Sequence, residues 1–339
     1  MRTAIIAATA AGLALALAPP AARADDPMLL KFAFPAPPMS YVMTGGVDPW
    51  VKQVMAEAGD TIEIKTFPGA AIANFGNVYD RVTNGVAELG FGTVGTVAGL
   101  FQRTSVTNVP FITQESYESS MAAWRLNAQG VTSEDFKAVK ILGLFTFASG
   151  GLHSTKPIKS GEDFKGLKLG TSGKLQADSF NLLGAAPITM TPAETYQALQ
   201  RGLVAGVNLS WAGVQVFKLH EVTHHHLELP FGAAAGYFIM NKDAYAKLPG
   251  KARAAIDKHS GEPLSKMTSL AGIEDDNKNL TRMKALPDQS FYRITREEEA
   301  RWQKLLAPIT EEWIKATPDG AKILEAYKRE VLIARSEKR

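Results

Sequence analysis

The chain has 339 residues, of which 45% are hydrophobic and 21% charged, and its formal net charge is +3. Both signs of charge are interspersed, which excludes the extended basic face of a nucleic-acid-binding protein. The absence of cysteine excludes disulfide bonds, thiolate nucleophiles and cysteine metal sites, so stability must come from hydrophobic cores, and this length suits two better than one.

The first 24 residues have the three parts of a signal peptide. Arg2 supplies the positive charge, residues 3–18 are apolar, and residues 22–24 read Ala-Arg-Ala, the A-x-A pattern of a cleavage site. We expect residues 1–24 to be removed and the mature protein to be periplasmic. The alternative is an uncleaved membrane anchor, for which this apolar run is short.

The first part of the mature chain predicts a βαβαβ unit. Its strands are expected at residues 29–34, 61–67 and 89–92, and its helices at residues 47–58 and 77–84. Strands joined by helices run parallel, and ligands of such sheets bind at the carboxyl ends of the strands.

A small, hydroxyl-rich segment follows the third strand. Residues 91–96 read Phe-Gly-Thr-Val-Gly-Thr, and Phe91, Gly92 and Thr93 are candidates for a pocket wall that ligand atoms approach closely. The alternative is a glycine-rich turn packed for steric reasons. A nucleotide-binding loop is excluded, because no Gly-Lys-Ser/Thr is present.

Residues 154–211 predict a second unit of the same kind. Its strands are expected at residues 167–169, 187–190 and 204–209. A helix is expected at residues 174–183, and Thr191 marks the start of another. The Thr191 hydroxyl can cap that helix, and the Glu194 carboxylate can reach back to the Thr191 amide. The strand ends place residues 170–173 and 208–211 at the edge where ligands bind.

Histidines offer two further candidates for function. His153 follows an apolar strand expected at residues 141–148 and could contact a ligand, or it could be a surface or internally satisfied core residue. His220 and residues 224–226 suggest a metal site, but three adjacent histidines cannot share one face, and the HExxH spacing is absent. We expect a surface connector there, with neither metal nor cofactor.

The remaining periodic segments predict helices that fill the core. They are expected at residues 116–127, 251–259, 264–284 and 297–316. Trp302, Leu306 and Trp313 lie on one face of the last of these. The basic segment 328–339 is expected to be a solvated helix end.

Several segments carry a resemblance to one known family. They are GEDFKGLKL (161–169), LGAAPITMTPAETYQALQRGLVAG (183–206), FPGAAIANFGNVYDRVTNGVAELGF (67–91) and FIMNKDAYAKLPGKARAAI (238–256). Taken in their order along the chain, they resemble the periplasmic solute-binding proteins of TRAP transporters, the DctP-like family. The resemblance covers most of residues 30–260.

The resemblance implies an α/β, two-lobed periplasmic binding protein of the type II-like class, with a hinge and long C-terminal helices. The expected parts are an N-terminal α/β lobe at 25–147 with returning C-terminal segments, a second α/β lobe at 148–250, and helices spanning the lobes at 251–339. Such a protein has no catalytic residues. It captures a small organic acid, delivers it to TRAP membrane subunits, and touches the membrane only through the permease.

One departure from the family concerns the ligand. The arginine that usually pairs with the ligand carboxylate is replaced by Gly170, and the usual VDGQENP segment reads Val-Ala-Gly-Val-Asn-Leu-Ser at 204–210. Two chemistries remain open. A carboxylate could be held by residues 171–173 at a helix N-terminus, with Lys174 or His153. Alternatively, an apolar ligand could be buried against aromatic side chains.

We expect an aromatic or otherwise hydrophobic organic acid rather than sialic acid or a C4-dicarboxylate. The candidate ligand-binding residues are Phe34, Phe91, Gly92, Thr93, His153, Gly170, Thr171, Ser172, Asn208, Trp211 and Tyr237. A binding protein that serves a periplasmic sensor remains an alternative. A periplasmic enzyme is disfavoured, because a GxSxG elbow and paired carboxylates in the glycine-rich loops are absent.

Overall fold

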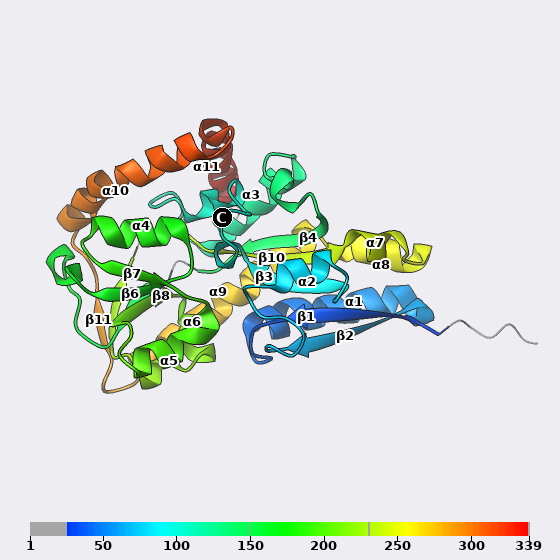
Figure 1. Cartoon of the computed structure of the whole chain (residues 1–339), viewed down its shortest axis with the longest axis horizontal. Helices are drawn as coiled ribbons and strands as arrows, with labels where there is room; N and C mark the ends of the chain where they lie inside the picture. The colour runs from blue at the N-terminus through cyan, green and yellow to red at the C-terminus, as the bar shows by residue number, and fades with distance from the viewer. Residues whose placement is uncertain (1–25, 149, 230, 338–339) are drawn as a thin grey trace, which may run out of the picture.

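The computed structural model describes residues 26–148, 150–229 and 231–337, so the expected signal peptide lies outside the described residues. The described chain forms two β-sheets with helices on their faces (Figure 1). The strand orders are β2-β1-β3-β10-β4 in the first sheet and β11-β9-β5-β8-β6-β7 in the second. This two-lobed α/β architecture confirms the predicted fold class.

The first sheet is built mainly from the N-terminal part of the chain. Its strands are β1 (Met28–Phe34), β2 (Ile62–Pro68), β3 (Leu89–Thr93), β4 (Val139–Thr146) and β10 (Ala235–Asn241). β1 pairs in parallel with β2 and β3, as expected when helices α1 (Asp48–Ala58) and α2 (Val78–Thr83) connect them. β10 runs antiparallel between β3 and β4.

Aromatic side chains fill the core of the first sheet. α1 buries Trp50 and Val54 one turn apart, and the Trp50 ring meets Phe32 edge-on at 6.2 Å between ring centroids. The Trp50 Nε1–H donates to Ser260 Oγ at 3.2 Å, so the buried indole is also satisfied as a polar group. Edge-on ring contacts of this kind stabilise the fold by about 0.5–1.5 kcal/mol in addition to the free energy gained by burying the surface of the rings.

The second sheet is built from the middle of the chain. Its strands are β5 (Gly151–Ser154), β6 (Lys168–Thr171), β7 (Ala186–Thr189), β8 (Gly206–Leu209), β9 (His225–Glu228) and β11 (Ser290–Tyr292). The helices α4 (Lys174–Leu182), α5 (Thr195–Gln200) and α6 (Trp211–Val216) accompany it. The predicted cap at Thr191 is confirmed, and it caps the 3₁₀ turn η7 (Pro192–Glu194) that leads directly into α5: the Thr191 amide donates to Glu194 Oε2 at 2.7 Å.

The expected lobe boundary at residue 250 needs a correction. β10 lies within the range 148–250 that was assigned to the second lobe, yet it pairs with β3 and β4 of the first sheet. β5 was not predicted, because its four residues, Gly-Leu-His-Ser, are too short to show an alternating pattern. Its pairing partners, β8 and β9, come from distant parts of the chain.

A set of C-terminal helices joins the two halves. They are α8 (Gly250–His259), α9 (Glu262–Lys284), α10 (Arg296–Ala316) and α11 (Gly320–Glu337). α9 contacts β4 near its start and α6 toward its end, so it runs from one half to the other (Figure 1). Its first half lies tightly against the π-helix η1 (Val42–Val47), because a Cβ on Gly45 would approach Ala271 Cβ closely and one on Gly46 would meet Thr268 Oγ1 at 2.7 Å.

α11 corrects the expectation of a solvated basic tail. It packs against α3 (Ser116–Ala128), where the buried Tyr327 hydroxyl lies 2.6 Å from Ser119 Oγ. Arg335 Nε donates to Glu118 Oε2 at 2.6 Å, so this basic residue is part of a helix–helix contact. The charged composition of the segment concealed its buried face.

The remaining short helices lie in connections. They are η2 (Gly59–Thr61), η3 (Val94–Thr96), η4 (Thr104–Asn108), η5 (Ser133–Phe136), η6 (Gly161–Phe164), η8 (Leu219–Glu221) and α7 (Lys242–Ala246). Within the residues described, none of the helices has the combination of length and apolarity needed to cross a bilayer.

Candidate functional site

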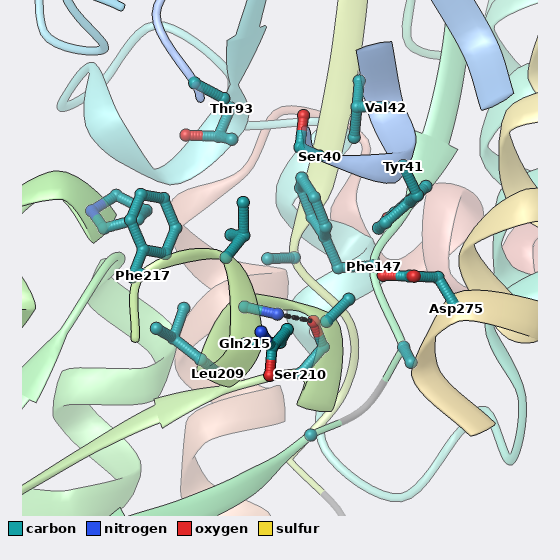
Figure 2. Close-up of a pocket in the computed structure, with 18 of the residues that line it drawn as sticks. Ser40, Tyr41, Val42, Thr93, Phe147, Leu209, Ser210, Gln215, Phe217 and Asp275 are labelled. Carbon is teal, nitrogen blue, oxygen red and sulfur yellow. Dashed lines mark hydrogen bonds between the residues drawn. The ribbon is translucent and has the colours of Figure 1, made fainter. Parts of the chain in front are cut away.

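A pocket of about 310 Å³ lies where the two sheets face each other (Figure 2). Its walls come from the segments after β1, β3 and β4 of the first sheet, from the ends of β6 and β8 of the second, and from α6 and α9. Most of these segments follow the carboxyl ends of strands, which is where α/β sheets bind ligands. The volume falls at the lower end of the range typical of small-molecule sites, roughly 300–1,000 Å³.

Aromatic rings form much of the wall on the side of the first sheet. Tyr41 and Phe147 meet at 6.3 Å between ring centroids, and Phe75 meets Phe91 at 6.1 Å, both nearly edge-on. Figure 2 shows Tyr41 and Phe147 opposite the side chains of α6 and the segment that follows it, where Phe217 adds a further ring. These rings can bury an apolar ligand surface and favour a planar one.

Two buried oxygens of the pocket lining have no partner within the described chain. They are Ser40 Oγ and Gln215 Oε1, from opposite walls. Leaving a buried polar atom without a hydrogen bond costs roughly 1–3 kcal/mol. A ligand or water in the pocket can supply the missing partners, so these atoms add polar contacts to a mainly aromatic site.

Four of the eleven predicted site residues line this pocket, namely Phe91, Thr93, Ser172 and Asn208. The other seven do not, namely Phe34, Gly92, His153, Gly170, Thr171, Trp211 and Tyr237. Phe34 stacks behind Phe91 at 5.0 Å, and Tyr237 belongs to the core on the opposite face of the sheet. Gly92 makes room for that ring, because a Cβ there would lie 2.3 Å from the Tyr237 hydroxyl.

His153 and Trp211 lie behind the pocket wall in a buried cluster with His226. His153 Nδ1 is 2.8 Å from His226 Nδ1, and His153 Nε2 is 2.9 Å from the Leu209 carbonyl oxygen. The indole of Trp211 lies 4.7 Å from the His153 ring and 5.0 Å from the His226 ring. Two neutral imidazoles satisfy these contacts when His153 donates to Leu209 and His226 donates to His153. His226 Nε2 is then an acceptor, so the Gln289 side chain 2.7 Å away must present its NH₂ group to it.

The electrostatics of this cluster favour neutral rings. Burial, followed by the neighbouring His226, lowers the pKa of His153 to about 3, and burial lowers the pKa of His226 to about 4. A neutral buried imidazole cannot act as a cation for a ligand carboxylate. The expected surface connector at 224–226 is also wrong for His226, which lies in β9 with 2% of its surface exposed.

The segment after β6 offers less to an anion than its sequence suggests. The backbone N–H of Ser172 already donates to Gln176 Oε1 at 3.2 Å, and Lys174 pairs with Asp178 at 2.5 Å on the surface. Thr171 Oγ1 is buried without a partner within the described chain, but Thr171 is not part of the pocket lining. This leaves Ser172 as the contribution of this segment to the pocket.

Sequence reasoning missed the contribution of α9. Asp275, Lys278, Asn279 and Arg282 line the pocket from one face of this helix. They recur at three- and four-residue spacing, which was a signal present in the sequence, but the segment 264–284 was assigned to the core as a whole. Locating this face required knowing that α9 passes between the sheets.

The neighbouring Asp276 fastens α6 to α9. Its Oδ1 accepts from the Ala212 amide at 2.9 Å, in the first turn of α6. Burial raises the pKa of Asp276 to about 6, against the opposing effect of its hydrogen bonds. Among the residues that the structure describes, no group of three or more His, Cys, Asp or Glu is arranged to hold a metal ion.

Comparison with known proteins agrees with this geometry. The sequence profile of the DctP family, bacterial extracellular solute-binding protein family 7, matches residues 36–316. The C4-dicarboxylate-binding periplasmic protein DctP of Rhodobacter capsulatus is 26% identical over 336 residues, which is 96% of each chain.

Solved structures are similar over nearly the whole chain. A TRAP solute-binding protein from Rhodoferax ferrireducens T118, in complex with copurified benzoate, has a TM-score of 0.87 and 26% identity, covering 92% of this chain and all of its own. A TRAP periplasmic solute-binding protein from Bordetella bronchiseptica with bound (R)- and (S)-mandelate has a TM-score of 0.83 and 23% identity. The match covers 90% of this chain and 99% of the Bordetella chain. The chain therefore belongs to the DctP family of extracytoplasmic solute-binding proteins, which serve TRAP transporters and are not enzymes.

Proposed function

We propose that this protein captures a small aromatic or otherwise hydrophobic carboxylic acid in the periplasm and delivers it to the membrane subunits of a TRAP transporter. In this proposal residues 1–24 are a cleaved signal peptide, and the pocket between the sheets is the ligand site. The two lobes close on the ligand by a hinge movement.

The aromatic wall is the observation that carries the choice of ligand. Tyr41, Phe75, Phe91 and Phe147 gather on one side of a pocket of about 310 Å³. Burial of apolar surface contributes about 25 cal/mol per Å², so a ring enclosed by these side chains gains more than a polar sugar acid would. The similar protein from Rhodoferax ferrireducens was solved with benzoate, which is a ligand of this kind.

The experiment begins with native mass spectrometry of the mature protein, purified without refolding, to detect any ligand retained from the cell. A thermal-shift screen then compares benzoate, 4-hydroxybenzoate and mandelate with succinate and sialic acid. A ligand at a hundredfold excess over its Kd stabilises the folded state by about 2.7 kcal/mol.

We expect the aromatic acids to raise the melting temperature. A shift with succinate or sialic acid and none with the aromatic acids would contradict the proposed ligand class while leaving the membership of the family unchanged. The same screen repeated at high salt separates specific binding from weak surface association of anions.

A further inference from the structure

The charged side chains that line the pocket, within the residues described, all come from one face of α9. They are Asp275, Lys278 and Arg282, at positions i, i+3 and i+7. The other side chains of the lining are apolar or uncharged. With Asp275 ionised, this face contributes two positive charges and one negative charge, so α9 gives the pocket a net charge suited to a monoanion.

The two cations are available to a ligand, whereas the carboxylate is already engaged. Asn279 Nδ2 donates to Asp275 Oδ2 at 3.0 Å. In the part of the chain that the structure describes, neither Lys278 nor Arg282 lies within ion-pair distance of a carboxylate. Arg282 lies two turns beyond Asp275, a rise of roughly 10 Å along the helix, and so is well separated from it.

The position of the usual family arginine is closed to a long side chain. A Cβ on Gly170 would lie 2.8 Å from Val207 Cγ1 and 2.9 Å from Met190 Sδ, so these two side chains occupy the space. The other candidate cations are unsuitable, because His153 is buried and Lys174 pairs with Asp178. A carboxylate in this pocket needs a different partner.

We propose that Arg282, assisted by Lys278 one turn earlier, holds the carboxylate of the ligand. This inference rests on the proposed function and names the groups that give the same pocket its selectivity for acids. The guanidinium offers two parallel N–H donors that match a carboxylate, and the ammonium of Lys278 adds a point charge. The ligand ring then points from α9 toward Phe91 and Phe147, which fits a molecule with one charged end and one apolar end.

The experiment measures binding by isothermal titration calorimetry with benzoate, with its uncharged counterpart benzamide, and with succinate. The variants are Arg282→Gln, Arg282→Lys, Lys278→Gln and, as a matched control, Lys266→Gln. Lys266 is an exposed cation of the same helix that does not line the pocket. Thermal unfolding checks that each variant is folded. Because Arg282 is exposed, we expect its substitution to leave the fold intact.

We expect Arg282→Gln to weaken benzoate binding about 10- to 100-fold, the range for loss of a charge-assisted hydrogen bond. Lys278→Gln should have a smaller effect, Arg282→Lys an intermediate one, and Lys266→Gln none. The preference of the wild type for benzoate over benzamide should disappear in Arg282→Gln. Equal benzoate affinity in the wild type and Arg282→Gln overturns the inference and leaves the proposed function standing.

The experiment also separates failure of the proposed ligand class from failure of the assignment of Arg282. If the wild type binds succinate and neither aromatic compound, the proposed ligand class fails, and a loss of succinate binding in Arg282→Gln still supports the assignment of Arg282. If the wild type binds none of these carboxylates, both the proposed ligand class and the role of Arg282 are overturned.

Discussion

Gly170 is enclosed by Met190 and Val207, which lie on the segments that flank its strand. A Cβ at this position would come within 3 Å of both side chains, so Gly170→Ala forces them to move. Overpacking of this kind typically destabilises a protein by about 1–3 kcal/mol. We predict a lower melting temperature for Gly170→Ala, measured by calorimetry. Gly250→Ala is the matched control, because a Cβ there meets nothing within 4 Å, and equal stability of the two variants would contradict the argument.

The buried pair His153 and His226 predicts how stability depends on pH. Their folded pKa values, about 3 and about 4, lie below the unfolded value of about 6.5. Between pH 4 and 6.5 the unfolded chain therefore binds more protons. The stability contributed by each histidine is complete above pH 6.5 and falls by about 1.4 kcal/mol per pH unit below it.

The measurement is urea unfolding between pH 4.5 and 7.5 for the wild type and His153→Gln. We expect a shallower pH dependence in the variant. The pKa of Asp276 is raised to about 6, so this carboxyl makes the free energy of unfolding increase as the pH falls, opposite to the histidines. Because Asp276 is present in both proteins, its effect cancels in the comparison. Parallel curves for the two proteins would show that His153 is protonated equally in the folded and unfolded states.

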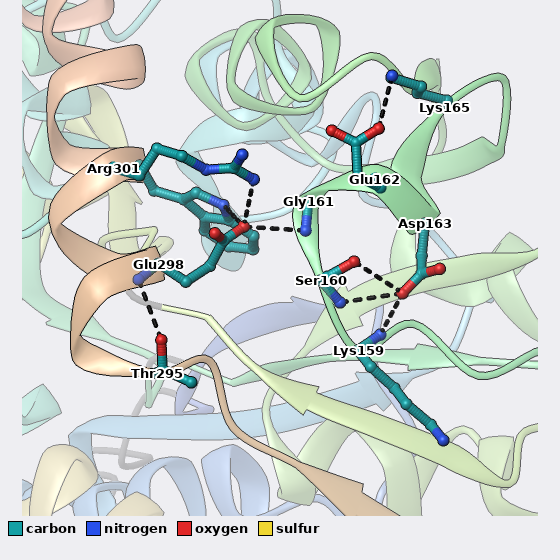
Figure 3. Close-up of polar contacts among 10 residues, drawn as sticks. Lys159, Ser160, Gly161, Glu162, Asp163, Lys165, Thr295, Glu298 and Arg301 are labelled. Carbon is teal, nitrogen blue, oxygen red and sulfur yellow. Dashed lines mark hydrogen bonds and ion pairs between the residues drawn. The ribbon is translucent and has the colours of Figure 1, made fainter.

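The contact between α10 and η6 ties a C-terminal helix to the second sheet (Figure 3). Glu298 Oε1 accepts from the Gly161 amide at 3.0 Å, from Arg301 at 2.7 Å and from Trp302 Nε1 at 2.7 Å. Burial raises the pKa of Glu298, but these hydrogen bonds outweigh it and leave the pKa lowered. The carboxylate thus satisfies an indole whose residue, Trp302, is completely buried.

Three groups donate to Glu298. The Gly161 amide and the Trp302 indole belong to buried residues and would lose their partner without this carboxylate, whereas the exposed Arg301 can turn to water. We predict that Glu298→Ala lowers the free energy of unfolding by about 1–3 kcal/mol, the range for a buried group left without a partner. Glu298→Gln keeps an acceptor oxygen and should lose less. Glu311→Ala, an exposed position on the same helix, serves as the control, and an equal loss in both alanine variants would refute the role of this contact.

Local patterns predicted the elements well where neighbours in sequence decide the structure. The cap at Thr191, which starts the 3₁₀ turn η7 ahead of α5, and the parallel pairing of β1 with β2 and β3 follow from capping and periodicity. β5 and α11 were missed or misread, because their partners are distant in sequence and their own patterns are short or charged. Helical periodicity located α9 but did not show which of its faces meets the pocket.

The residues of the pocket likewise divide into those that local sequence patterns predict and those that depend on distant segments. Phe91, Thr93, Ser172 and Asn208 were predictable, since each lies in the last three residues of a strand or just after it. Tyr41 lies beside η1, in a stretch that showed no regular pattern. Predicting its role requires the arrangement of the two sheets, which depends on contacts between segments more than a hundred residues apart.

The two halves of the molecule approach each other closely at Gly95, where a larger side chain would not fit. A Cβ on Gly95, in the segment after β3, would lie 2.0 Å from the carbonyl oxygen of Ser172, in the segment after β6. Gly95→Ala should therefore prevent this approach and weaken ligand binding about tenfold or more, as expected for a clash of 1–3 kcal/mol. Calorimetry gives the affinity, and small-angle X-ray scattering tests whether the liganded variant stays more extended than the wild type.

Gly173→Ala provides a control from the same contact. A Cβ there would lie 3.6 Å from Gly95 Cα, an ordinary distance. This variant should close and bind as the wild type does. If both variants bind equally well, the approach of these two segments is not needed for ligand binding.

The position of Trp211 also gives the protein a built-in optical probe. Its indole is enclosed by His153, His226 and Phe291, while the adjacent residues Ser210 and Ala212 face the pocket. Because the indole is buried one layer behind the lining, we expect a ligand seated against Ser210 and Ala212 to change the intensity of Trp211 fluorescence by altering the packing around the ring. A Trp211→Phe variant separates this signal from those of the other four tryptophans, so that capture of the solute can be followed in real time without any label.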